Sequence, residues 1–144
     1  MQKMVFGAAG LLCALLLSAG LWMWAGRDPQ ARVEARFAAD LPQLTRTAQG
    51  LLAGEAAEPP AGWTGADVYG EAVCFDAGGW GFGSSTSYRG VVYVPSDRPV
   101  GFQGLDMAGA IPSGDGWLWE EAEGDNRCYV ERLAPGWYYY KMRF

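Results

Sequence analysis

The stretch Trp137-Tyr138-Tyr139-Tyr140-Lys141-Met142-Arg143-Phe144 alternates two sets of side chains, as a β-strand with two different faces does. Tyr138, Tyr140, Met142 and Phe144 form the first set, which we predict to face the core. The second set is predicted to face solvent, with two exposed aromatic rings among two cations, and comprises Trp137, Tyr139, Lys141 and Arg143. This strand predicts an antiparallel sheet at the centre of the fold.

Further strands precede it, separated by turn signals about ten residues apart. Glu123-Gly124-Asp125-Asn126 is typical of a hairpin loop that accepts positive φ. Residues 105–114 are predicted to form a loop. The predicted strands before Trp137 are 68–77, 88–94, a short one at 100–103, 117–122 and 127–133. We therefore expect a meander of about five or six strands over residues 67–144.

A helix is predicted upstream of these strands, in residues 28–54. Asp28 and Pro29 are a typical cap and first helical residue. Pro42 predicts either a kink or a second helix capped by Asp40. Apolar residues recur every three or four positions, a stripe that would cover one face of the sheet: Val33, Phe37, Leu41, Leu44, Ala48 and Leu51. Residues 55–66, with Pro59 and Pro60, form a connector.

An apolar run from Met4 to Ala25 has no charge between Lys3 and Arg27. At about 1.5 Å per residue, a helix of this length covers the roughly 30 Å hydrocarbon core of a bilayer. We predict a transmembrane signal-anchor in residues 1–27. A cleaved signal peptide is the alternative, with the small residues Ser18-Ala19-Gly20 before the cut. Cleavage there would leave the apolar segment through Trp24 unexplained.

The orientation of this anchor has two readings. Arg27, Arg32 and Arg36 after the run favour a cytoplasmic domain by the positive-inside rule. The export-like start and a cysteine pair favour the opposite side. A disulfide between Cys74 and Cys128 would contribute about 4 kcal/mol in the chain-entropy model. We expect a bacterial inner-membrane protein whose domain lies in the periplasm or outside, with this disulfide formed.

Composition disfavours several functions. The net charge is −5 with a pI near 4.6, and no basic stripe in the sequence suits nucleic acid. The chain lacks histidine, a nucleophile motif and a metal-ligand spacing, so we expect no enzyme, no metal and no cofactor.

Two groups of residues are candidates for a partner surface. Trp80 and Phe82 lie in the glycine-rich stretch Gly79-Trp80-Gly81-Phe82-Gly83. This stretch does not match a phosphate-binding glycine loop, because neither a helix nor a lysine follows it, and it is predicted to be a hairpin or bulge. If exposed, these rings are typical binding residues, as are Trp137 and Tyr139. The second group is an acidic hairpin: Glu120, Glu121, Glu123 and Asp125.

These features together predict an α+β protein with an N-terminal transmembrane helix and an amphipathic helix packed on a small antiparallel sheet. The predicted function is an exported, non-enzymatic binding or assembly module of the bacterial envelope, with a protein partner there and the lipid bilayer contacted through residues 4–25. An alternative is a periplasmic inhibitor or immunity-type protein that uses the acidic hairpin.

The order of anchor, helix and sheet resembles the layout of type IV pilins, which implies a pilin-like subunit as a third function. Two features of the sequence depart from that family. No Gly-Phe-Thr-Leu-x-Glu stretch precedes the apolar run, and Pro29 interrupts a continuous helix.

Overall fold

The computed structural model describes residues 28–83 and 85–144. It shows an α+β fold in which one helix packs on a seven-stranded antiparallel sheet. The chain divides into two compact units, 1–32 and 33–144, and the account below concerns the second and the described start of the helix. The predicted transmembrane segment, residues 4–25, lies outside the described residues. Within the described ranges, no helix combines the length and apolarity needed to cross a bilayer.

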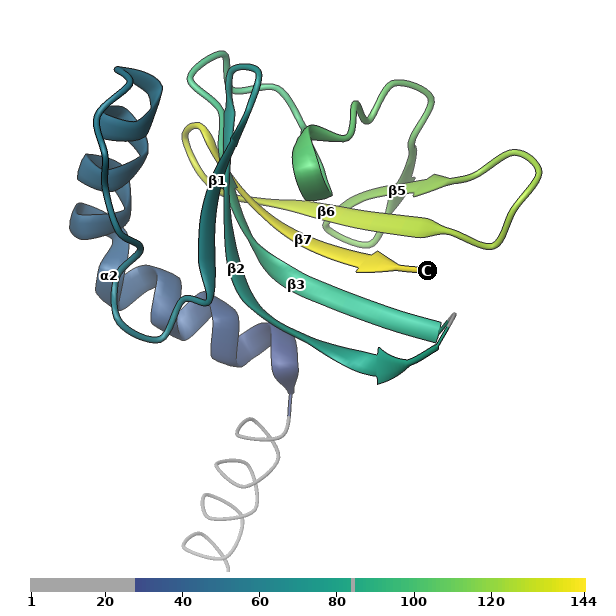
Figure 1. Cartoon of the computed structure of the whole chain (residues 1–144). Coiled ribbons are helices and arrows are strands. Elements are labelled where there is room, and N and C mark those ends of the chain that lie inside the picture. The colour runs from purple at the N-terminus through teal and green to yellow at the C-terminus, as the bar shows by residue number, and fades with distance from the viewer. Residues whose placement is uncertain (1–27, 84) are drawn as a thin grey trace, which may run out of the picture. The chain divides into compact units, whose positions relative to one another are not determined.

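The strands follow the order β1-β2-β3-β7-β6-β5-β4 across the sheet. Two meanders therefore meet where β3 pairs with β7, and Figure 1 shows the sheet curling along its length. The bounds are β1 Gly65–Tyr69, β2 Ala72–Phe82, β3 Ser85–Tyr93, β4 Ile111–Ser113, β5 Gly116–Glu120, β6 Arg127–Ala134 and β7 Trp137–Arg143, with a 3₁₀ turn η1 at Phe102–Gly104. The predicted antiparallel sheet is confirmed, but it has seven strands in two meanders, where one meander of about five or six strands was expected.

Three predicted boundaries differ. The strand expected at 68–77 is divided by a turn, because Gly70 adopts φ +63°, and its two halves pair as β1 and β2. The segment 100–103 is not a strand, since η1 forms there and Val100 makes only an isolated bridge with Asp106. The predicted loop 105–114 contains the short edge strand β4.

The amphipathic helix is α2, Pro29–Leu52. Its predicted start is confirmed, since the Gln30 N–H donates to Asp28 Oδ1 at 2.9 Å. Pro42 lies inside the helix and does not end it, and Figure 1 shows α2 bending along its length. The predicted stripe meets the sheet through Val33, Phe37, Leu44 and Ala48, all buried.

The outer face of the sheet is the one that α2 packs against, and it carries Val91, Trp137 and Tyr139. Trp137 is 3% exposed and Tyr139 is fully buried, so the predicted exposure of both rings is wrong. The alternation in β7 correctly separates two sets of side chains. It does not reveal that both faces of this central strand are covered. The Trp137 ring contacts the rings of Phe37, Phe75 and Tyr93 at 5.0–5.8 Å.

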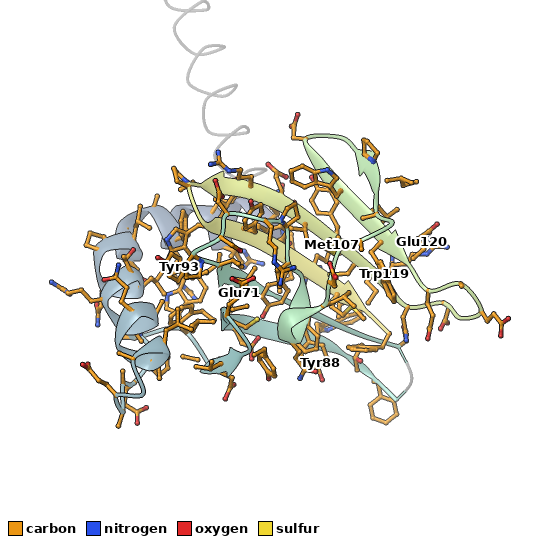
Figure 2. The ribbon with its side chains drawn as sticks, turned by 90° about the horizontal axis from the view of Figure 1, so that it is seen from above. Glu71, Tyr88, Tyr93, Met107, Trp119 and Glu120 are labelled. Carbon is orange, nitrogen blue, oxygen red and sulfur yellow. The ribbon has the colours of Figure 1, made fainter. Side chains whose placement is uncertain are left out.

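The inner face carries Tyr138 and Tyr140 and is covered by the chain between β3 and β4. Figure 2 shows this segment, which contains the labelled Met107, crossing over the sheet. Cys74 and Cys128 belong to this core as buried free thiols, so the predicted disulfide is not formed. The physical reason is strand order, since β3 and β7 separate β2 from β6.

Candidate interaction surface

Three chain segments gather at one end of the sheet, which we call the distal end. They are the β2–β3 hairpin, the end of β7 and the β5–β6 hairpin, and Figure 1 shows the C-terminus between the two hairpins. The structure brings Trp80 and Phe82 to the first hairpin and the acidic residues to the second. Trp137 and Tyr139 lie in the core and take no part in this surface.

Trp80 and Phe82 project from a regular two-stranded ribbon. Trp80 pairs with Ser87 and Phe82 with Ser85, after a bulge between Asp76 and Gly78. The two rings are 82% and 97% exposed, which meets the condition under which the sequence made them candidate contact residues. Of the predicted alternatives, a hairpin or a bulge, the hairpin is confirmed. Large apolar side chains so fully hydrated cost free energy in the isolated chain, so they are typical of contact residues.

A shallow hollow of about 270 Å³ lies beside Trp80 and is lined by Gly79, Trp80, Gly81, Thr86 and Tyr88. The Tyr88 ring stacks on Phe102 at 5.2 Å and meets Phe144 at 6.0 Å. A side chain at Gly81 would place Cβ 2.2 Å from the Ser85 carbonyl oxygen, so the glycine permits the close approach of the two strands. The hollow thereby extends the aromatic surface inward.

The acidic hairpin is exposed throughout residues 120–125. Glu120 forms an ion pair with Arg127 at 3.0 Å, which ties the base of the hairpin together. Hydrogen bonding from the Glu121 N–H to the Asn126 carbonyl oxygen, at 3.0 Å, closes the loop. Among the described residues, no cluster of carboxylates or thiols has the arrangement of a metal site.

Four cations lie on the outer face. The sequence pattern placed Lys141 and Arg143 on one side of the last strand but did not bring Arg89 and Arg127 to them, because these come from two other strands. Arg143 pairs in register with Arg127 on β6, and Lys141 pairs with Arg89 on β3. Residues paired across antiparallel strands point to the same face. Alternate residues of a strand point to the same face. Arg89 lies two residues from Val91, Arg127 two from Tyr129, and Lys141 and Arg143 two and four from Tyr139, so all four cations lie on the outer face with these core residues. We call Arg89, Arg127, Lys141 and Arg143 the basic patch.

A hollow of about 180 Å³ opens within the basic patch. Its lining comprises Leu118, Arg127, Tyr129, Lys141 and Arg143. The Tyr129 hydroxyl donates to Glu131 Oε2 at 2.7 Å, and burial together with this carboxylate raises the pKa of Tyr129. Three cations therefore line a small cavity, and the Glu131 carboxylate lies beside it through its hydrogen bond with Tyr129.

The two thiols of the inner core are buried, and burial favours their protonated form near neutral pH. Burial raises the pKa of Cys74 to about 11 and that of Cys128 to about 11. A nucleophilic or metal-binding cysteine needs the thiolate form, which burial disfavours here. Their role in the described structure is packing.

The distal end combines three kinds of exposed side chain. Exposed rings stand on one hairpin, cations cover the adjoining outer face, and carboxylates cover the other hairpin. Comparison of the chain with protein-family models, with curated proteins and with solved structures finds no match.

Proposed function

We propose that the protein is an exported, membrane-anchored binding or assembly module whose distal end contacts a protein partner in the bacterial envelope. The observation that carries the proposal is the exposure of Trp80 and Phe82 on a paired β-ribbon. Large exposed aromatic rings are over-represented among the residues that contribute most to protein–protein binding. The apolar run of residues 4–25 supports the membrane anchor.

Pull-down of the full-length protein from formaldehyde-crosslinked envelopes tests the partner surface. We expect the wild type to capture a specific protein, and Trp80→Ala and Phe82→Ala each to reduce the captured amount about tenfold or more. The matched control is Val68→Ala, which removes an apolar side chain that is 44% exposed on β1, at one edge of the sheet. Capture that is indifferent to Trp80 and Phe82 would refute the assignment of this surface.

Protease access in intact spheroplasts tests the location. We expect the domain to be cleaved from outside, because an export-like segment precedes it. Protection until lysis would mean that Arg27, Arg32 and Arg36 have set a cytoplasmic orientation. That result would overturn the localisation but leave the partner surface intact.

The exposed acidic hairpin favours one other candidate function, an inhibitor or immunity-type protein for a basic envelope toxin or hydrolase. Glu121, Glu123 and Asp125 are all exposed at its tip. Such a complex would weaken steeply between low and high salt. Reversal of these charges with Lys should then abolish protection against the toxin, whereas Trp80→Ala should have little effect.

A further inference from the structure

The basic patch opposes like charges directly across neighbouring strands. Arg143 faces Arg127, and Lys141 faces Arg89, in a protein whose net charge is −5. Directly opposed side chains have Cβ atoms about 4.5–5.5 Å apart, and like charges at that spacing destabilise a sheet. The chain contains 16 acidic residues, yet none of them occupies one of these four positions. Retained local repulsion of this kind is typical of a functional site.

The structure offsets only part of this repulsion within the described residues. Glu120 pairs with Arg127 at the edge of the patch. Neither Arg89 nor Arg143 forms an ion pair with any carboxylate of residues 28–83 and 85–144. An anion bound in the hollow would relieve the repulsion between Arg127 and Arg143, which both line it.

The neighbours of the patch indicate which anion fits. Trp80 lies in register with Ser87, which in turn pairs with Arg143, so an exposed ring stands in the same row as two arginines on the outer face. Trp, Tyr and Arg are the residues most enriched at protein–protein hot spots. At the other end of the row stand Glu120 and the acidic hairpin. An anionic membrane is a broad surface that would meet this hairpin too and repel it, whereas a narrow chain segment can contact the cations alone.

We propose that the basic patch is the docking site for an acidic segment of the protein partner, with a carboxylate seated in the hollow of Arg127, Lys141 and Arg143 and an apolar side chain against Trp80. This inference rests on the proposed function and specifies the partner's chemistry. The hollow of about 180 Å³ accommodates one carboxylate side chain. The cations steer the encounter, and the exposed ring supplies apolar burial.

Lysine placement makes the site directly testable. The sequence has two lysines, Lys3 and Lys141, and Lys141 lines the hollow. Carbodiimide couples a carboxylate to an amine in direct contact and adds no spacer. We expect treatment of envelopes carrying the full-length protein to give an adduct in which Lys141 is joined to an Asp or Glu of the partner, located by mass spectrometry.

Matched variants separate charge from reactivity. Lys141→Arg keeps the cation and removes the amine, so it should abolish the adduct. Arg89→Ser and Arg143→Ser keep the amine and should lower the adduct yield roughly tenfold in combination. Arg46→Ser removes an exposed cation of α2 outside the patch and should have no effect.

The outcomes are distinct. Partner capture that depends on Trp80 but gives no Lys141 adduct would overturn this inference alone, as would an adduct indifferent to Arg89 and Arg143. Absence of any captured partner would sink the proposed function and this inference together. A lipid-facing patch predicts that phosphatidylglycerol in phosphatidylcholine nanodiscs protects Lys141 from acetylation without any partner, and that result would also overturn the inference.

Discussion

Asp97 joins two turns at the end of the sheet opposite the candidate surface. Its carboxylate accepts hydrogen bonds from Arg132 Nη2 at 2.6 Å, the Gly136 N–H at 2.7 Å and the Tyr138 hydroxyl at 3.0 Å. These donors, Arg132 first among them, hold the pKa of Asp97 well below its usual range. Its φ of +51° is a left-handed conformation that this network maintains.

The first prediction concerns acid stability. A carboxyl whose pKa is lowered by folding stabilises the native state above its unfolded pKa of about 3.9, and this contribution is lost as the pH falls. Asp97→Asn should therefore lower the urea midpoint at pH 6 and differ less from the wild type at pH 2.5. Asp106→Asn is the control, because the Asp106 carboxyl is exposed and its ion pair with Arg98 is long, at 3.8 Å. An equal decrease in the urea midpoint at both pH values would contradict the stabilising role of the Asp97 charge.

The second prediction concerns the thiols. Because burial raises the pKa of Cys74 and Cys128 to about 11, neither should react with iodoacetamide at pH 8 in the folded protein. Both should be alkylated in urea without reductant, as judged by mass spectrometry of their peptides. Alkylation that requires prior reduction would restore the disulfide that the sequence suggests and contradict the free thiols of the structure.

The aromatic residues show how far sequence patterns reach at this scale. The sequence placed Trp80 and Phe82 in a hairpin or bulge and left their exposure open, and the structure shows both rings exposed. Trp137 and Tyr139 were misassigned, because alternation divides side chains between faces without showing what covers each face. Only the packing of α2 on the outer face decides their burial.

At the scale of elements, α2 and the sheet depend on each other. An isolated helix of this kind is marginal in water, so its stability comes from the buried stripe. Leu44 is fully buried at the contact with the outer face. The third prediction is that Leu44→Ala lowers the free energy of unfolding by about 2–5 kcal/mol. Gln43→Ala, next to it but exposed, should change it by less than about 0.5 kcal/mol in urea titrations. Similar effects of the two would refute the docking of α2.

The centre of the sheet depends on one close approach. Gly90 on β3 lies in register between Asp76 on β2 and Tyr140 on β7, and the Tyr140 hydroxyl donates to Asp76 across it. A Cβ at Gly90 would stand 2.5 Å from the Tyr140 hydroxyl and 2.0 Å from the Phe75 carbonyl oxygen.

The fourth prediction follows from this crossing. Gly90→Ala should destabilise the protein by about 3 kcal/mol or more, since neither backbone nor ring can move freely. Gly79→Ala, at the open hairpin, meets mainly the partly exposed Tyr88 ring and should cost less. Thermal unfolding of the two variants compares them directly, and equal losses would contradict the account of the sheet centre.

Local signals predicted most elements but could not predict their neighbours. The cap of α2, the β2–β3 hairpin and the last three strands follow from capping, turn and alternation rules. The pairing of β3 with β7 joins residues about fifty positions apart and has no local signature. Arg89 joins the basic patch only through that pairing, whereas Arg127, Lys141 and Arg143 come from the neighbouring strands β6 and β7.

At the scale of the whole molecule, both faces of the sheet are covered near α2, whereas the distal end carries basic and acidic side chains in two separate groups. The basic patch and the acidic hairpin lie side by side there, although the net charge is −5. Electrostatic contacts of exposed groups weaken with salt, so both candidate functions predict salt-sensitive association. The charges responsible differ between them.

The fifth prediction separates the two by charge reversal. If the partner carries the acidic segment, Arg143→Glu should weaken its capture about tenfold at low salt, and Glu123→Lys should weaken it little. The opposite ranking would favour the inhibitor function. Capture at low and at high salt, compared between the two variants, gives the answer.

Photocrosslinking at the distal end tests the central claim most directly. Benzoylphenylalanine placed at Phe82 in the full-length protein should form an adduct with one specific envelope protein in intact cells. The same group at Val68, exposed on β1, should form none. Equal adducts at both positions, or none at Phe82, would contradict the claim that the distal end of the sheet is a partner surface.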